Sequence, residues 1–130
     1  MTKELKDKAV DIKGKKYVLV SDRVLYFNET YPNGSISTEL LSPYDSDLIV
    51  IKATVRPDLS QERVFIGHSQ AKVGDGYINK TSALENAETS AVGRALAFMG
   101  IGVIESIASA DEINKANNQK IKVAEDDLDF

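Results

Sequence analysis

The sequence predicts an α+β domain, mainly built of antiparallel strands with helices, in which the strands precede one long helix. Three segments of strand character lie between residues 36 and 70, joined by turns that contain proline, aspartate and serine. A helical pattern then extends from Ser82 to Phe98, with alanine at every fourth position along one stripe. Segments that are neighbours in sequence usually pair in space. We therefore expect an antiparallel meander that rests on an alanine-rich helix.

The length and composition indicate one domain with one core, because the chain has 130 residues of ordinary hydrophobic content. The absence of cysteine excludes disulfides and thiolate metal sites in this sequence and is compatible with a reducing cytoplasm. No apolar run approaches the length that a bilayer requires. The first sixteen residues are too charged for a secretory signal.

The net charge of −4 is unevenly distributed along the chain. Residues 1–16 hold six lysines against three acidic residues, whereas residues 17–110 hold seven basic residues against eleven acidic ones. Residues 111–130 hold three lysines against six acidic residues. Nucleic-acid-binding domains are usually basic. Any nucleic-acid-binding face of this chain must therefore be a local patch.

The N-terminal part predicts a short strand and a short helix after a polar arm. Residues 1–15 are polar and broken by Gly14, so we expect a mobile arm or a short frayed helix. Lys16–Val20 is typical of a short strand. A short helix is expected from Arg23 to Glu29, because the Ser and Asp before it are good capping residues.

The three central strands are expected at Ile36–Leu41, Leu48–Arg56 and Glu62–Gln70. The second is the strongest, because it is rich in β-branched residues. Tyr77 and Ile78 could add a fourth edge strand, and residues 101–107 predict either a short strand or packed coil.

The long helix is expected to begin at a capping box formed by Ser82 and Glu85, with Thr81 as a rival cap. Its apolar stripe consists of Leu84, Ala87, Ala91, Ala95 and Phe98. Because most of the stripe is alanine, the helix can approach its neighbours closely. Arg94 lies beside the stripe and suits either an ion pair with a core carboxylate or a phosphate contact.

The composition changes near residue 113, after which few apolar residues and no periodic pattern remain. Such composition is typical of a disordered tail. The expected organisation is an arm at residues 1–15, one domain at residues 16–112 and an acidic tail at residues 113–130.

Two features that carry chemistry elsewhere are interpreted as structural. Gly74–Thr81 approximates a phosphate-binding loop, but Asn79 replaces its second glycine and the preceding strands are expected to be antiparallel, so we interpret it as a turn and a helix cap. His68 is the only histidine, and no group of residues has metal-ligand spacing. We predict no enzymatic activity, no metal and no cofactor.

A nucleic-acid-binding face is predicted on the strands. Lys52 and Arg56 point away from the apolar face of their strand. In the next strand we expect Val64 and Ile66 on the apolar side, with Arg63 and Phe65 gathered beside the cations on the other. Cations that hold phosphates and a ring that stacks on bases are what single-stranded nucleic acid requires. The alternative is a solvated strand face, with the phenylalanine buried under a loop. The candidate DNA-binding residues are Lys52, Arg56, Arg63, Phe65, Lys72, Tyr77 and Lys80.

The acidic tail predicts a docking segment for partner proteins, because an aromatic residue among acids suits a basic-rimmed apolar pocket. Its candidate residues are Asp126, Asp127, Leu128, Asp129 and Phe130. This tail resembles the acidic C-terminal tip of bacterial-type single-stranded-DNA-binding proteins, although the proline that usually precedes the final phenylalanine is replaced by aspartate.

The body is similar to a family of small single-stranded-DNA-binding proteins encoded by siphophages of lactic bacteria. The similarity covers most of residues 16–112 and is most distinctive in the segment ETSAVGRALAFMG. It implies a variant of the oligonucleotide-binding (OB) barrel, with the long helix packed on it. It also implies a homo-oligomer, a dimer or tetramer, that binds single strands in the host cytoplasm during phage DNA replication or recombination.

A second resemblance concerns the order of the elements. Three antiparallel strands followed by a long alanine-rich helix look like the β-β-β-α core of annealing proteins of the Rad52 type. That resemblance implies an annealing activity on single strands as the alternative function.

Overall fold

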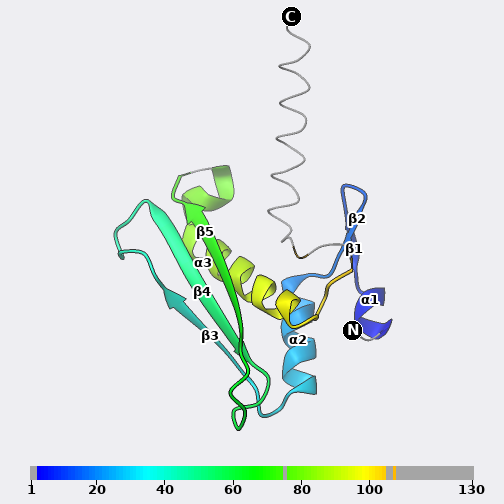
Figure 1. Cartoon of the computed structure of the whole chain (residues 1–130). Coiled ribbons are helices and arrows are strands. Elements are labelled where there is room, and N and C mark those ends of the chain that lie inside the picture. Colours follow the sequence, from blue (N-terminus) through cyan, green and yellow to red (C-terminus); the bar gives the residue numbers. More distant parts are fainter. Residues whose placement is uncertain (1–2, 75, 105–106, 108–130) are drawn as a thin grey trace, which may run out of the picture.

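The computed structural model describes residues 3–74, 76–104 and 107, with only the backbone of residues 76–81 included. This part of the chain is an α+β fold with two antiparallel sheets (Figure 1). The elements in chain order are α1 (Lys3–Asp7), β1 (Val10–Ile12), β2 (Lys15–Tyr17), α2 (Val20–Thr30), β3 (Ser35–Leu40), β4 (Leu48–Arg56), β5 (Phe65–Lys72) and α3 (Gly76–Phe98).

The larger sheet has the order β3-β4-β5, and the smaller one pairs β1 with β2. The predicted α+β class, the antiparallel meander and the long helix packed on it are confirmed. The described strands form no closed barrel, however, because β2 pairs with β1 and not with the larger sheet. Tyr77 and Ile78 belong to α3 and add no strand. The order β3-β4-β5-α3 is the β-β-β-α order of the alternative expectation.

Several element boundaries differ from those predicted. β4 matches its predicted range, whereas β5 begins three residues later and ends two residues later than expected. α2 begins at Val20 after an N-cap at Leu19 that makes no side-chain hydrogen bond, so the polar residues after it are not caps. Part of the predicted arm is structured, since α1 and β1 lie within it and Leu5 is buried.

The helix α3 carries a backbone break and a clear end. Ser82 has φ −147° and ψ 41°, so a regular helix starts only after it, as the predicted capping position indicates. At the other end, the Ile101 N–H donates to the Leu96 carbonyl at 3.0 Å and the Gly100 N–H donates to the Ala97 carbonyl at 2.8 Å. Gly100 has φ +94°. This is the Schellman arrangement, which requires a left-handed residue after the helix.

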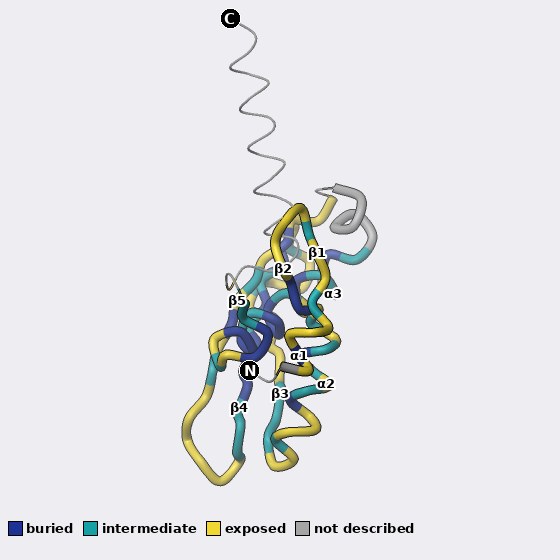
Figure 2. Tube along the Cα trace, turned by 90° about the vertical axis from the view of Figure 1, so that its right-hand side faces the viewer, coloured by how far each residue is buried: buried dark blue, intermediate teal, exposed yellow. Residues whose placement is uncertain are grey.

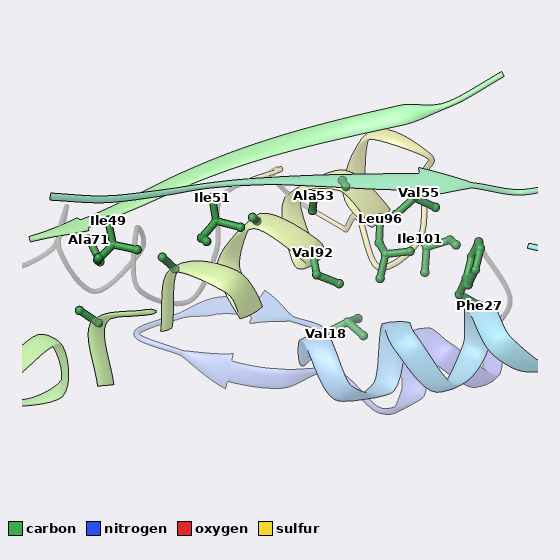
Figure 3. Packing of buried hydrophobic residues seen from close by; sticks show 14 of the residues in the cluster. Val18, Phe27, Ile49, Ile51, Ala53, Val55, Ala71, Val92, Leu96 and Ile101 are labelled. Carbon is green, nitrogen blue, oxygen red and sulfur yellow. The ribbon is translucent and has the colours of Figure 1, made fainter. Parts of the chain in front are cut away.

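The helix α3 lies between the larger sheet and α2, and the core fills both sides of it (Figures 1 and 3). Small residues permit this close packing. A Cβ at Gly67 of β5 would lie 2.5 Å from the Ala95 nitrogen, and a Cβ at Gly93 would lie 2.6 Å from Val20 Cγ2. Figure 2 shows the buried residues gathered in the middle of the fold and the exposed residues in its hairpin turns.

A buried arginine joins three parts of this fold. Arg23 of α2 is 2% exposed, and its Nε donates to the Val18 carbonyl at 2.8 Å while Nη1 donates to the Gly93 carbonyl of α3 at 3.0 Å. Its guanidinium lies 4.9 Å from the centroid of the Tyr17 ring. Burial lowers the pKa of Arg23, and Tyr17 acts in the opposite direction. The side chain stays charged because an arginine pKa begins far above neutrality.

Candidate nucleic-acid interface

The two faces of β4 differ in burial as predicted. Ile49, Ile51, Ala53 and Val55 are buried against α3, whereas the residues between them are half-buried on the opposite face. Lys52, Thr54 and Arg56 therefore point away from the core. β3 is tied to the helix side as well, since Thr38 Oγ1 donates to Glu88 Oε2 of α3 at 2.7 Å.

The prediction for β5 assigned its two faces the wrong way round. Phe65 pairs with Val55 and shares its side of the sheet, whereas Ile66 pairs with Thr54 and His68 pairs with Lys52. The reason is Gly67, because β5 approaches the backbone of α3 so closely at this position that a side chain would not fit. No larger residue of β5 fits there, so the bulky Ile66 faces outward even though its hydrophobicity indicated burial.

The outward side chains of the three strands form a surface that we call the open face. Helix α3 covers the other side of the sheet. The open-face side chains are half-buried or exposed. The open face consists of Ser35, Ser37 and Glu39 from β3, Leu48, Val50, Lys52, Thr54 and Arg56 from β4, and Ile66, His68, Gln70 and Lys72 from β5.

The open face is locally basic in a chain whose net charge is negative. It carries Lys52, Arg56 and Lys72 against a single acid, Glu39, which pairs across the strands with Lys52. The positions between them hold hydroxyl and amide groups together with the aliphatic side chains of Leu48, Val50 and Ile66. His68 is a further candidate that sequence reasoning missed. The cross-strand register is what indicates it, because this register places His68 directly opposite Lys52.

The turn between β4 and β5 is held by a hydrogen-bonded network. Asp58 Oδ1 accepts from the Ser60 N–H at 2.9 Å, from Ser60 Oγ at 2.7 Å and from Asn33 Nδ2 at 2.6 Å. These hydrogen bonds lower the pKa of Asp58, and the one from the Ser60 backbone N–H has the largest effect. The charge of Arg56 acts in the same direction. Arg56 Nε donates to the Gln61 carbonyl at 2.9 Å, which ties the end of the open face to this turn.

Arg63 and Phe65 lie at this turn and not on the open face. The Arg63 guanidinium carbon lies 4.8 Å from the centroid of the Phe65 ring. Both residues line a hollow of about 380 Å³, which we call the turn hollow. Its lining residues are Tyr31, Pro57, Asp58, Gln61, Arg63, Phe65 and Met99.

The structure thus brings three of the seven predicted DNA-binding residues onto one face and two into the adjacent turn hollow. The side chains of Tyr77 and Lys80 lie outside the described residues, as do those of the predicted docking segment at residues 126–130. The Arg94 guanidinium lies 5.4 Å from the centroid of the Phe98 ring. A cation–π contact therefore accounts for part of its environment.

Three further results concern the described residues. They include no group of three or more His, Cys, Asp or Glu side chains that could hold a metal ion. The strand before the phosphate-loop-like segment is antiparallel to β4, whereas true phosphate-binding loops follow a strand of a parallel sheet. A search of the described helices finds none with the length and apolar character of a membrane span.

Comparison with known proteins gives one match. Neither the curated proteins nor the solved structures contain a match to the chain. One family model, described as Slr1353 N-terminal dsRNA-binding domain-like, matches residues 24–99. The match extends from within α2 through β3, β4 and β5 to the end of α3, and it covers more than half of the chain. The chain therefore belongs to the Slr1353 N-terminal dsRNA-binding domain-like family.

Proposed function

We propose that this protein binds nucleic acid through the open face and catalyses no reaction on it. The observation that carries the proposal is the row of Lys52, Arg56 and Lys72 on a sheet surface opposite the helices. Arginine, lysine, serine, threonine and glutamine supply many of the contacts that proteins make to phosphates. All of these residue types occur on the open face. The family description, which names a dsRNA-binding-like domain, supports the same general role.

Single-stranded DNA is the ligand that we favour. The region that matches the family model holds six basic residues against nine acidic ones, which leaves little positive surface for two phosphate backbones. The sheet is only about 10 Å wide across its three strands and roughly 30 Å long along the nine residues of β4, whereas recognition of duplex RNA by shape extends over about 16 base pairs. The resemblance to phage single-stranded-DNA-binding proteins supports the same ligand.

Duplex RNA is the second candidate, and two observations favour it. The family description names that ligand class. In addition, among the described strand residues the open face presents cations, hydroxyls and three aliphatic side chains, and its one ring is that of His68. Contacts to phosphates and sugars without base stacking are typical of duplex RNA recognition.

The biological role follows the phage resemblance. A homo-oligomer of this protein would protect and organise single strands in phage replication or recombination, and residues 126–130 would recruit partner proteins. The order β3-β4-β5-α3 supports strand annealing as a related activity. Annealing predicts that the protein accelerates the pairing of complementary strands, which single-strand binding alone does not require.

A competition experiment tests the choice of ligand. Fluorescent oligo-dT is bound to the purified protein, and unlabelled oligo-dT, duplex DNA and duplex RNA are added as competitors at two salt concentrations. We expect oligo-dT to compete at the lowest concentration and all affinities to fall with salt, because phosphate contacts release counterions. More effective competition by duplex RNA would transfer the proposal to the second candidate. Failure of all three nucleic acids to bind would refute it.

A further inference from the structure

We propose that the turn hollow seats one unstacked base of a bound single strand. This inference rests on the proposed function, and it goes beyond it by assigning a base-binding site. The open face offers cations and hydroxyl groups that can contact phosphates, but its described residues offer few side chains on which a base could stack. The turn hollow supplies groups that can contact a base. It lies next to Arg56, the cation at the end of β4.

The lining of the turn hollow suits a flat, partly polar ring. Tyr31 and Phe65 contribute aromatic surface, Met99 contributes an adaptable apolar side chain, and the Arg63 guanidinium lies against the Phe65 ring. Bases in protein complexes stack on aromatic rings and on arginine planes. Tyr31 is itself positioned by stacking on Phe27, with ring centroids 5.3 Å apart. The volume of about 380 Å³ lies within the range of small-ligand sites.

The charges around the turn hollow favour a base inside it and phosphates outside it. Asp58 lines the hollow, and the hydrogen bonds that it accepts keep its carboxylate ionised at neutral pH. Arg63 also lines the hollow, so the lining carries no net charge and suits an uncharged base better than a phosphate group. The three hydrogen bonds that Asp58 accepts from described residues all go to Oδ1, so Oδ2 has lone pairs for a base amino or imino group.

The position of Arg56 connects the two surfaces. It lies at the end of β4 on the open face, and its Nε donates to the Gln61 carbonyl, while Gln61 itself lines the turn hollow. A strand that runs along the open face on Lys52 and Arg56 is thus led to the end of β4, where it can turn toward the hollow on the α3 side of the sheet. Only a strand with an unpaired base can fill the hollow, which links this site to the choice of single strands.

The test compares two fluorescent strands of about 15 nucleotides, near the upper end of known site sizes. One is oligo-dT, and the other has the same sugar-phosphate backbone with abasic residues throughout. Fluorescence anisotropy measures the binding of both strands to the wild-type protein and to the variants Phe65→Leu and Arg63→Lys. The second variant keeps the positive charge and removes the flat guanidinium.

We expect the wild-type protein to bind oligo-dT more tightly than the abasic strand. Each variant should lose about 5-fold to 150-fold in affinity for oligo-dT, the range expected for one stacked base. Affinity for the abasic strand should not change. Equal losses for both strands, or no loss for either, would overturn the base site and leave the proposed function standing.

The outcomes separate the two proposals. If the wild-type protein binds neither strand, the proposed function itself fails. Arg63 is exposed, so the Arg63→Lys variant retains the fold and decides the question even if Phe65→Leu unfolds. Thermal denaturation of each variant before the binding measurement establishes which of them are folded.

Discussion

The substitution Gly67→Ala tests the packing that decides which side chains of β5 reach the open face. An added Cβ would lie 2.5 Å from the Ala95 nitrogen and 2.6 Å from the Ala91 carbonyl oxygen. Ordinary contact begins near 3.4 Å, so β5 and α3 would have to separate by roughly 0.9 Å. Overpacking of this kind costs about 1–3 kcal/mol. Because both opposing atoms belong to the backbone of a buried helix, we expect a value near the upper end.

A loss of about 2–3 kcal/mol corresponds to a fall in Tm of roughly 10–15 °C for a domain of this size. Chemical denaturation followed by circular dichroism measures the free energy of unfolding. The control is Gln70→Ala on the opposite face of the same strand, which should stay within about 0.5 kcal/mol of the wild type. Adding Ala95→Gly should not restore stability, since the clash involves backbone atoms. A Gly67→Ala protein as stable as the wild type would refute the assigned faces of β5.

Three further predictions follow from the same structure. Arg23→Met should lower the free energy of unfolding by about 3 kcal/mol or more, measured by urea denaturation, because two buried carbonyls lose charged donors; an effect under 1 kcal/mol would contradict that role. The lowered pKa of Asp58 means that its stabilising effect is present above its unfolded pKa and is lost as pH falls through the lower folded pKa. Asp58→Asn should therefore lower Tm at pH 7, and the difference from wild type should vanish in acid; a constant difference down to pH about 2 would count against the network. Deleting residues 126–130 should leave affinity for oligo-dT unchanged or raised, because the segment is acidic; a large loss of affinity would contradict its assignment to partner binding.

The elements that the sequence predicted well are those whose signals agree at every level. In β4, alternation, β-branched composition and flanking turns all indicate the same strand, and its range is correct. The long helix begins its regular part after Ser82 and ends at Phe98, two residues before the left-handed Gly100.

The features that the sequence did not predict depend on contacts between distant segments. The outward face of β5 was assigned wrongly because Ile66 is hydrophobic, whereas the deciding feature is the approach of Gly67 to α3. The buried role of Arg23 requires the carbonyl of Gly93, seventy residues away. A pattern within one segment contains neither contact. The geometry of the candidate site was consequently predicted in part: Lys52 and Arg56 lie on the outward side of β4 as expected, whereas Phe65 lies in the turn hollow.

The most direct test of the central claim, that the open face binds nucleic acid, is the salt dependence of oligo-dT affinity in a charge-matched pair of variants. Lys52→Gln with Lys72→Gln removes two charges from the open face and leaves Arg56 to hold the turn. Lys6→Gln with Lys15→Gln removes two charges from α1 and β2, which lie away from that face (Figure 1). The first pair should weaken binding and reduce the slope of log affinity against log salt by about 1.4, since each lost phosphate contact contributes about 0.7. The second pair should bind like the wild type. Equal effects of the two pairs, or an unchanged slope in the first, would contradict the claim.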